Sequence, residues 1–541
     1  MLKYCNSAIF GLRFYYPLTS NHYPMKTFRP VASIAAMLFL VLLSGCQNDT
    51  PATTSLPRST PEAEGVSSEG LITFLDSAAV SRHEFHSIMI VRHGKVIAEG
   101  WWDPYRPDLR HTLYSTSKSF TSTAIGFAVT EKLLTVNDKV ISFFPEQLPD
   151  TVSPLLADMT VRDLLTMTAG QAPDPSNVIS SSAGDWVPAF FAIPVLKDPG
   201  SEFLYNSMAT FMLSAIIQKV TGEKLIDYLQ PRLFEPLGIE GIDWEVSPEG
   251  INTGGWGLLI KTEDMAKFGQ LYLQKGSWNG RQIIPAGWIE EATSFKIDQV
   301  PDAPSEVKEK SDWMQGYCYQ FWRSRNNAYR ADGAFGQYII VMPEKDAVVA
   351  ITSESPDMQD VLNMVWKYIL PAMHDGELPE NIETAGILKE RLESLALPLP
   401  SKEPNPPLAE LISGKTFTLE ENGLKLKAIT VGFTEEACDL TVATDDQAYT
   451  VPFGNGERIE TTTGLGGPGI LRRPGAVTSN KVSGSYEWSG DSTLVLTLRY
   501  IESPHHMKIT SIFTGDNVEI RIRLSTPPGY DIPPVRGKVI K

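Results

Sequence analysis

Paired strands and helical repeats of apolar residues share one long region of the chain. Residues 87–92 and 95–99, joined at His93-Gly94, have the apolar pattern that is typical of a β-hairpin, and residues 338–342 and 347–352 form a second such pair. Strands and helices mixed in this way predict an α/β (α+β) domain over residues 61–397. The helical repeats, several with a glycine just beyond the last turn, are residues 116–130, 161–168, 210–220, 263–274 and 361–370.

The pattern changes after a proline-rich stretch. Residues 398–407 read Pro-Leu-Pro-Ser-Lys-Glu-Pro-Asn-Pro-Pro, which predicts a stiff linker between two domains. Short alternating or apolar runs broken by Gly, Asp and Asn turns follow, and they predict a small all-β barrel or sandwich over residues 408–541, whose role is left open. The clearest runs are residues 424–430, 439–442, 448–452, 493–500 and 518–524.

The N-terminal region has the features of a secretory signal. Lys26 and Arg29 precede an apolar run over residues 31–43, which is too short to span a bilayer comfortably and ends in Leu43-Ser44-Gly45-Cys46. This end resembles the bacterial lipobox, where a peptidase cuts before the cysteine and the cysteine carries lipid. We therefore expect residues 25–46 to be a lipoprotein signal peptide and Cys46 to be the lipidated residue.

The segments on either side fit an envelope protein. Residues 1–24 have no signal architecture, so Met25 is the expected start of translation. Residues 47–60 are polar and rich in Pro, Thr and Ser, which predicts a flexible tether. Gln47 follows the cysteine, and a residue other than Asp there resembles outer-membrane sorting. The expected location is the bacterial cell envelope, lipid-anchored to the membrane through Cys46, on the outer membrane facing the periplasm.

Composition and charge narrow the classes of partner. The chain has 541 residues, of which 42% are hydrophobic and 21% charged, so it is long enough for two domains with cores. Its 47 Lys and Arg residues against 64 Asp and Glu residues give a net charge of −17, which argues against nucleic acid as a partner. The four cysteines include no C-x-x-C pair that could hold zinc, so neither thiol nor metal chemistry is expected. No cofactor is expected.

Candidate chemistry begins with a serine and a lysine three residues apart. In Tyr114-Ser115-Thr116-Ser117-Lys118, helical spacing puts the Lys118 ammonium on the same face as the Ser115 hydroxyl, whose proton a neutral lysine can take. The same S-x-x-K pattern occurs at Ser305 and Lys308, but among acidic residues of an expected solvated loop. Ser115 instead opens an apolar helix, whose N-terminus favours developing negative charge.

Two further segments add to this pair. Tyr205 lies in the turn-rich segment Pro199-Gly200-Ser201-Glu202-Phe203-Leu204-Tyr205-Asn206-Ser207, and its hydroxyl can shuttle a proton if nearby cations lower its pKa. The segment Ala331-Asp332-Gly333-Ala334-Phe335-Gly336-Gln337 leads into a strand, and its glycines allow a substrate to approach the backbone closely. An N–H group from Ala331 or a neighbour, with that of Ser115, is predicted to form an oxyanion hole.

Together, these residues in this order and spacing resemble the serine β-lactamase and penicillin-binding protein superfamily. The similarity is to its branch of class C β-lactamases, D-alanyl-D-alanine carboxypeptidases, esterases and 6-aminohexanoate-dimer hydrolases, and it covers about residues 61–370. The family's T-x-x-x-L-L-x-M-x-S-G segment looks like Met159-Thr160-Val161-Arg162-Asp163-Leu164-Leu165-Thr166-Met167-Thr168-Ala169-Gly170. The segment Gly254-Gly255-Trp256-Gly257-Leu258 also fits.

The resemblance implies a fold and a mechanism. The fold is an antiparallel sheet flanked by helices, with an all-helical subdomain. In the implied mechanism Ser115 attacks a carbonyl, Lys118 and Tyr205 share the base and acid roles, and water hydrolyses the acyl-enzyme. Whether Lys118 or Tyr205 is the primary base is left open. By the same resemblance, the residues expected to bind the substrate are Asn206, Ser207, Ala331 and Gly333.

Two departures from the family pattern bear on the substrate. Ser207 stands where the family's Tyr-x-Asn has asparagine, and a serine can hydrogen-bond less to a substrate amide. Tyr329-Arg330-Ala331-Asp332 replaces the K-T-G triad, so the cation that grips a β-lactam or peptide carboxylate is missing unless Arg330 supplies it. We therefore expect a serine hydrolase that cleaves an amide or ester bond of a small molecule or short peptide.

Two alternatives stay open at this point. The protein could be a D-amino-acid peptidase or weak β-lactamase that acts on cell-wall peptides. It could also be a catalytically silent envelope binding protein, although the intact Ser115, Lys118 and Tyr205 argue against this. The sequence leaves the physiological substrate and the oligomeric state open.

Overall fold

The computed structural model describes residues 55–466, 480–525 and 532–540, and residues 54–541 form one compact unit. The predicted signal peptide, Cys46 and most of the predicted tether lie outside the described residues. Leu56 is buried, and Arg58 pairs with Val96 at the edge of a sheet. The first domain therefore begins a few residues before the predicted boundary at Pro61.

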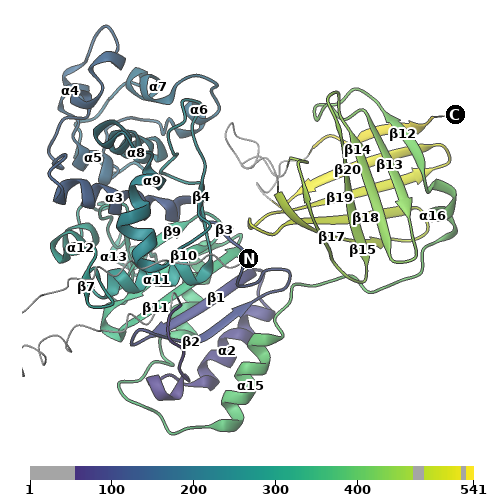
Figure 1. The fold of residues 1–541 in the computed structure, drawn as a ribbon, viewed down its shortest axis with the longest axis horizontal. Coiled ribbons are helices and arrows are strands. Elements are labelled where there is room, and N and C mark those ends of the chain that lie inside the picture. The colour runs from purple at the N-terminus through teal and green to yellow at the C-terminus, as the bar shows by residue number, and fades with distance from the viewer. Residues whose placement is uncertain (1–54, 467–479, 526–531, 541) are drawn as a thin grey trace, which may run out of the picture. The chain divides into compact units, whose positions relative to one another are not determined.

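A six-stranded antiparallel sheet forms the centre of the first domain, in the order β2, β1, β11, β10, β9, β8 (Figure 1). Both predicted hairpins are confirmed, as β1–β2 and β10–β11. Ile88 of β1 lies opposite Ile351 of β11, so the two hairpins are neighbours although they are far apart in the sequence. The strand bounds are β1 (Glu84–Arg92), β2 (Lys95–Trp101), β8 (Trp322–Arg323), β9 (Tyr329–Gly333), β10 (Gln337–Met342) and β11 (Ala347–Glu354).

Both faces of the sheet are buried. Successive side chains of a strand point to opposite faces, so neighbouring residues of β1 belong to different hydrophobic cores. Ile88 and Ile90 belong to one hydrophobic core, which includes residues of the helices α2 (Ser68–Ala79) and α15 (Ile382–Glu393). Met89 belongs to a second core, which includes residues of α11 (Thr262–Leu273). Strands covered on both faces need apolar residues at successive positions, which is why these strands read as apolar runs.

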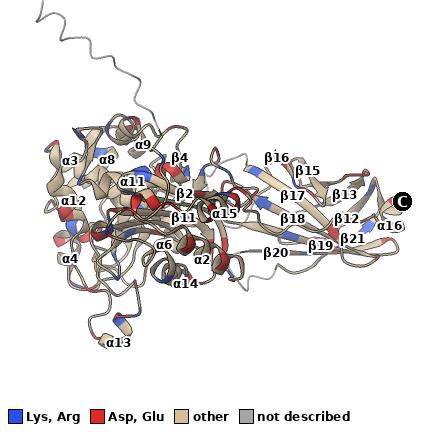
Figure 2. Cartoon of the chain, turned by 90° about the horizontal axis from the view of Figure 1, so that it is seen from below, with Lys and Arg blue, Asp and Glu red and all other residues tan. Residues whose placement is uncertain are grey.

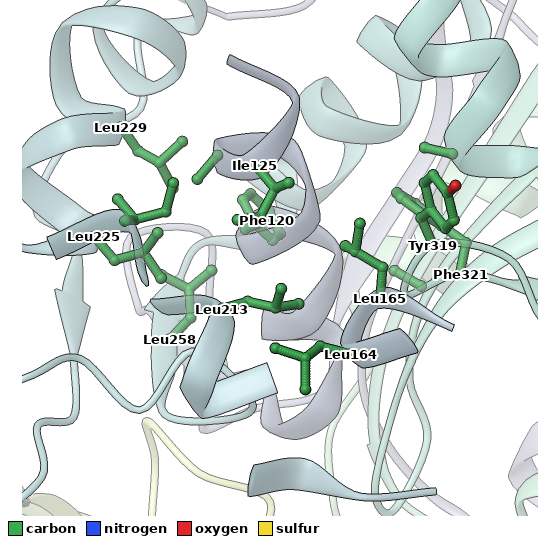
Figure 3. Packing of buried hydrophobic residues seen from close by; sticks show 14 of the residues in the cluster. Phe120, Ile125, Leu164, Leu165, Leu213, Leu225, Leu229, Leu258, Tyr319 and Phe321 are labelled. Atoms are coloured by element: carbon green, nitrogen blue, oxygen red, sulfur yellow. The ribbon is translucent and has the colours of Figure 1, made fainter. Parts of the chain in front are cut away.

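A group of helices surrounds α3 (Ser117–Thr130), which is buried along residues 117–128. Figure 3 shows Phe120 and Ile125 of α3 packed among leucines of neighbouring helices, such as Leu213 of α8 (Ser207–Thr221). Protein interiors are packed as densely as organic crystals, so a helix enclosed in this way has a fixed position. The residues just before α3 therefore stand on a rigid support.

All five predicted helices are present with shifted ends. The predicted helix 161–168 ends three residues early, at Leu165, because Met167 (φ 60°) and Gly170 (φ 74°) turn the chain. Gly222, with φ 76°, closes α8 as predicted. The observed helices are α3, α5 (Val161–Leu165), α8, α11 and α14 (Met358–Met364), which continues as the π-helix Val365–Ile369.

The second domain is a β-barrel, and the short helix α16 (Pro407–Ile412) precedes its first strand. Its strands run in the order β15, β14, β13, β12, β21, β20, β19, β18, β17, β16, and parallel pairing of Gly454 in β15 with Ser485 in β17 closes the sheet. Each of the five predicted runs overlaps a strand. The bounds are β12 (Lys415–Leu419), β13 (Ala428–Phe433), β14 (Ala437–Ala443), β15 (Ala448–Asn455), β16 (Ile459–Thr463), β17 (Asn480–Trp488), β18 (Thr493–Tyr500), β19 (His506–Thr514), β20 (Asn517–Leu524) and β21 (Val535–Val539).

Residues 398–406 join the two domains without helix or strand. Asn405 accepts hydrogen bonds from Tyr486 and Trp488, so the end of this linker is attached to the barrel. In the described part of the chain, each helix is too short or too polar to cross a membrane. Figure 2 shows that the positions of acidic and basic residues are interspersed along the backbone of both domains.

Candidate active site

Ser115 lies in a 3-10 turn, Tyr114–Thr116, that leads directly into α3. Within residues 111–128 Ser115 is the one residue that is not buried. The turn is fastened on both sides, since the Thr116 hydroxyl donates to Gln337 O at 2.8 Å and the Ser117 hydroxyl donates to Tyr114 O at 2.6 Å. Ser115 is therefore a partly exposed residue on a fixed turn, two residues before the first residue of α3, Ser117.

Lys118 is buried directly behind Ser115. Its Nζ donates to Ser115 Oγ at 3.0 Å, to Ser207 Oγ at 3.0 Å and to Gly255 O at 2.7 Å. Burial lowers the pKa of Lys118 from 10.5 to about 7, although the charges of Asp174 and Asp332 act in the opposite direction. The neutral and charged forms of the amine are therefore both available near neutral pH.

Tyr205 reaches the same serine from the loop before α8. Its hydroxyl hydrogen-bonds with Ser115, and the Lys118 Nζ lies 4.9 Å from its ring centroid. Burial raises the pKa of Tyr205 well above its usual value, although the hydrogen bond with Ser115 opposes this. Arg330 does act to lower this pKa, but burial outweighs it, and Tyr205 therefore keeps its proton near neutral pH. The structure does bring the predicted residues Ser115, Lys118 and Tyr205 together.

The two residues after Tyr205 have different positions from those expected. Asn206 is buried and caps α8, since its side-chain oxygen accepts from the N–H groups of Met208 and Ala209. Its amide nitrogen donates to Gln171 at 2.9 Å. The predicted role of Asn206 in substrate binding is therefore wrong, because its polar atoms serve the helix cap. Ser207 is partly exposed and bonded to Lys118, so it does line the site.

Ala331 and Gly333 belong to the strand β9, which the sequence did not predict. Gly333 contacts the turn that carries the nucleophile, since a Cβ atom added there would lie 2.2 Å from Leu113 O and 3.0 Å from Thr116 Oγ1. Ala331 is buried and pairs with Ile339 of β10. The end of β9 thus packs against the Ser115 turn, while residues 334–336 form the turn between β9 and β10.

Arg330 does not present a cation to a substrate. Its side chain is fully buried, and its Nη1 donates to Asp312 O at 2.9 Å and to Ser324 Oγ at 2.8 Å. Its Nε donates to Asp332 at 2.8 Å. Burial raises the pKa of Asp332 to about 6, although Arg330 opposes this. The option that Arg330 replaces the missing lysine is wrong, because its charge is used inside the domain.

Sequence reasoning missed three groups that act on Lys118. Gly255 accepts from its ammonium, and the carboxylates of Asp174 and Asp332 influence its charge. Gly255 lies in the Gly-Gly-Trp-Gly segment that the resemblance had singled out, so a usable signal existed. No such signal marked Asp174 or Asp332, because the sequence around an acidic residue does not show how far that residue lies from a lysine.

Two other features of the described residues do not compete for this chemistry. Ser305 is exposed on a four-residue helix, and Lys308 is bonded to Asp298 at 2.6 Å, so the second S-x-x-K pair is a surface feature as expected. A cavity of about 1020 Å³ lies along β2 and α15, and Ser115 is not among the residues that line it.

Comparison with known proteins shows the family to which this chain belongs. The sequence profile of the Beta-lactamase family matches residues 84–372, just over half of the chain, and the protein therefore belongs to the Beta-lactamase family. This confirms the predicted superfamily. The matched range contains Ser115, Lys118 and Tyr205 and ends before the barrel.

Individual relatives include a protein that is a hydrolase by name and a Beta-lactamase. The 6-aminohexanoate-dimer hydrolase of Paenarthrobacter ureafaciens is 26% identical over 289 residues, which are 50% of this chain and 73% of that protein. The Beta-lactamase of Escherichia coli K12 is 26% identical over 317 residues, 49% of this chain and 81% of that protein. A solved penicillin-binding protein homologue from Pyrococcus abyssi covers 84% of this chain and 99% of its own, with 19% identity and a TM-score of 0.45.

Proposed function

We propose that this protein is a serine hydrolase that cleaves an amide or ester bond of a small molecule or short peptide through an acyl-enzyme on Ser115. The observation that carries the proposal is the 3.0 Å hydrogen bond between Lys118 Nζ and the accessible Ser115 hydroxyl. A lysine with a pKa of about 7 can accept the hydroxyl proton at neutral pH.

Acylation then follows from these contacts. Neutral Lys118 takes the proton as Ser115 Oγ bonds to the carbonyl carbon and the carbonyl electrons move to oxygen. Ser207 Oγ and Gly255 O accept from the new ammonium, which stabilises its charge. We infer that Lys118 is the primary base, because the raised pKa of Tyr205 keeps the phenol protonated.

The later steps use the same groups. The oxyanion lies against N–H groups of Ser115 and the end of β9, which Gly333 brings into contact with the nucleophile turn. Tyr205, bonded to Ser115, passes a proton to the leaving alcohol or amine and regains one from Lys118. Water then attacks the acyl carbon as its proton goes to Lys118, and Lys118 returns this proton to Ser115 Oγ as the C–Oγ bond breaks and the acid is released.

The charges near the site favour substrates without a carboxylate beside the scissile bond. Asp174 and Asp332 act on Lys118, while Arg330 is enclosed in the domain. Amide oligomers and carboxylic esters fit this environment better than β-lactams or cell-wall peptides. The named activity of the Paenarthrobacter relative supports the amide choice.

Active-site labelling tests the proposal. A fluorophosphonate should form one adduct on Ser115, and Ser115→Ala should lose both the adduct and the hydrolysis of p-nitrophenyl acetate or an aminohexanoate dimer. Ser305→Ala is the matched control, because it removes the serine of the second S-x-x-K pair, and it should leave both unchanged. Equal turnover by wild type and Ser115→Ala would support the silent binding protein instead, and preferential turnover of nitrocefin would support the β-lactamase alternative.

We also propose that the protein is anchored in the bacterial envelope by lipid on Cys46. The proposal rests on the segment Leu43-Ser44-Gly45-Cys46 after an apolar run. Metabolic labelling with an alkyne fatty acid should mark the wild-type protein in the membrane fraction. An unlabelled wild-type protein, or labelling that persists in Cys46→Ala, would exclude this anchor.

A further inference from the structure

A histidine of the barrel is bonded to the residue that precedes the nucleophile. His505 lies in the turn between β18 and β19 and is fully buried. Its Nδ1 lies 2.8 Å from Glu354 Oε1, and its Nε2 is hydrogen-bonded with the hydroxyl of Tyr114. The Glu354 carboxylate accepts a hydrogen bond from Nδ1–H, so in this tautomer Nε2 accepts a hydrogen bond from the Tyr114 hydroxyl.

The same histidine contacts a second residue close to the site. The Phe335 ring lies edge-on to His505, with centroids 4.8 Å apart, and edge-on to Tyr114, with centroids 5.3 Å apart. His505 and Tyr114 also meet edge-on at 5.7 Å. The three aromatic rings thus form one cluster with residues from the nucleophile turn, the turn after β9 and the barrel.

Two members of this cluster have strained backbones. Tyr114 has φ 49° and Phe335 has φ 67°, in the left-handed region that bulky residues avoid. Such conformations are strained and persist only where surrounding contacts hold them. Here the contacts include the hydrogen bond to Tyr114 and the ring contacts of Phe335, and both involve His505.

The two strained residues flank the groups that would bind an oxyanion. Tyr114 directly precedes Ser115, and Phe335 follows Gly333 by two residues, where β9 meets the nucleophile turn. A change in either backbone would turn the N–H groups of these segments away from the reacting carbonyl. We propose that His505 of the barrel is a positioning residue for the active site, which holds both segments in the geometry that the oxyanion requires. The inference rests on the proposed serine hydrolase.

The barrel turn itself is fixed to the first domain by other contacts. Glu502 O accepts from Thr112 N at 2.9 Å, and the Glu502 carboxylate pairs with Arg110 at 3.1 Å. The Tyr105 hydroxyl donates to Ser503 O at 2.9 Å. The Glu502 side chain therefore offers a matched control, since it supports the same turn without touching Tyr114.

The test compares His505→Ala, His505→Gln and Glu502→Gln in the full chain. We measure the rate of fluorophosphonate labelling of Ser115, and kcat and KM for p-nitrophenyl acetate. His505→Ala should lower the labelling rate and kcat by about tenfold or more and change KM little. The oxyanion hole stabilises the charged transition state more than the bound substrate. His505→Gln, which keeps an acceptor for Tyr114, should recover most of the loss, and Glu502→Gln should match wild type.

Each outcome separates the two claims. Wild-type rates in His505→Ala, or an equal loss in Glu502→Gln, would overturn the positioning role while the proposed function stands. A wild-type protein without an adduct on Ser115 would overturn the proposed function itself. If His505→Ala does not fold, Tyr114→Phe removes the same hydrogen bond and should lower kcat in the same way; an unchanged kcat would overturn the inference.

Discussion

Lys118 is the residue whose environment decides the chemistry. The S-x-x-K spacing predicted that its amine meets Ser115, and the 3.0 Å contact agrees with this. The sequence could not predict how far burial lowers its pKa, because that depends on residues from several distant segments, such as Gly255 and Asp332. It also misplaced Asn206, since a polar residue before a helix can serve either a cap or a substrate.

The first prediction concerns pH. Because the pKa of Lys118 is lowered to about 7, the neutral base is half formed there, and kcat/KM should rise with pH through about 7 and level off above it. A kcat/KM profile for p-nitrophenyl acetate between about pH 5 and 9 measures this. A profile that is flat across this range would contradict the role of Lys118 as base.

The Asp174→Asn variant sharpens this prediction. The Asp174 carboxylate raises the pKa of Lys118, so its removal should move the rise in kcat/KM to lower pH. Asn keeps an oxygen for the hydrogen bonds from Ser176, and the residue is exposed, so the fold should be unaffected. A shift to higher pH would show that Lys118 is not the titrating group.

At the scale of elements, β9 links the sheet to the nucleophile. The hairpins β1–β2 and β10–β11 could be predicted because apolar runs flank their turns. β9 could not, because its sequence Tyr-Arg-Ala-Asp-Gly has a buried arginine and a buried aspartate where apolar residues are expected. These two charges are tolerated since they pair with each other at 2.8 Å.

The second prediction concerns Gly333. A Cβ atom there would lie 2.2 Å from Leu113 O, so Gly333→Ala should push β9 away from the Ser115 turn and lower kcat by at least about tenfold. Gly287→Ala in α12 (Ala286–Thr293) is the control, because a Cβ atom there meets nothing within 4 Å. It should leave kcat unchanged and raise stability by about 0.5–1 kcal/mol. Full activity of Gly333→Ala would contradict this contact.

At the scale of the whole molecule, the domain division could be predicted and the way the domains meet could not. The proline-rich linker and the change of pattern separate the two domains in the sequence. The contacts between them depend on single residues, such as Arg499 of β18 bonded to Glu84 of β1 and His505 bonded to Glu354. No periodic pattern marks such residues, so they read as ordinary surface charges.

The third prediction concerns acid stability. Burial alone would raise the pKa of Glu354, but hydrogen bonds from His505 and His506 bring it down from 4.5 to about 2. The carboxylate therefore contributes stability above about pH 4.5, which is lost as the pH falls towards 2. Thermal unfolding at pH values from 6 to about 2.5 should show a smaller decline in Tm for Glu354→Gln than for wild type. Equal declines would show that Glu354 does not support the folded state.

The most direct test of the central claim is acid quenching during turnover of p-nitrophenyl acetate, followed by mass spectrometry of the peptides. The hydrogen bond from Lys118 and the accessible position of Ser115 predict an acetyl group on Ser115 in wild type and none in Ser115→Ala. Turnover with no acetyl group on Ser115, or an acetyl group on another residue that accounts for the turnover, would contradict it.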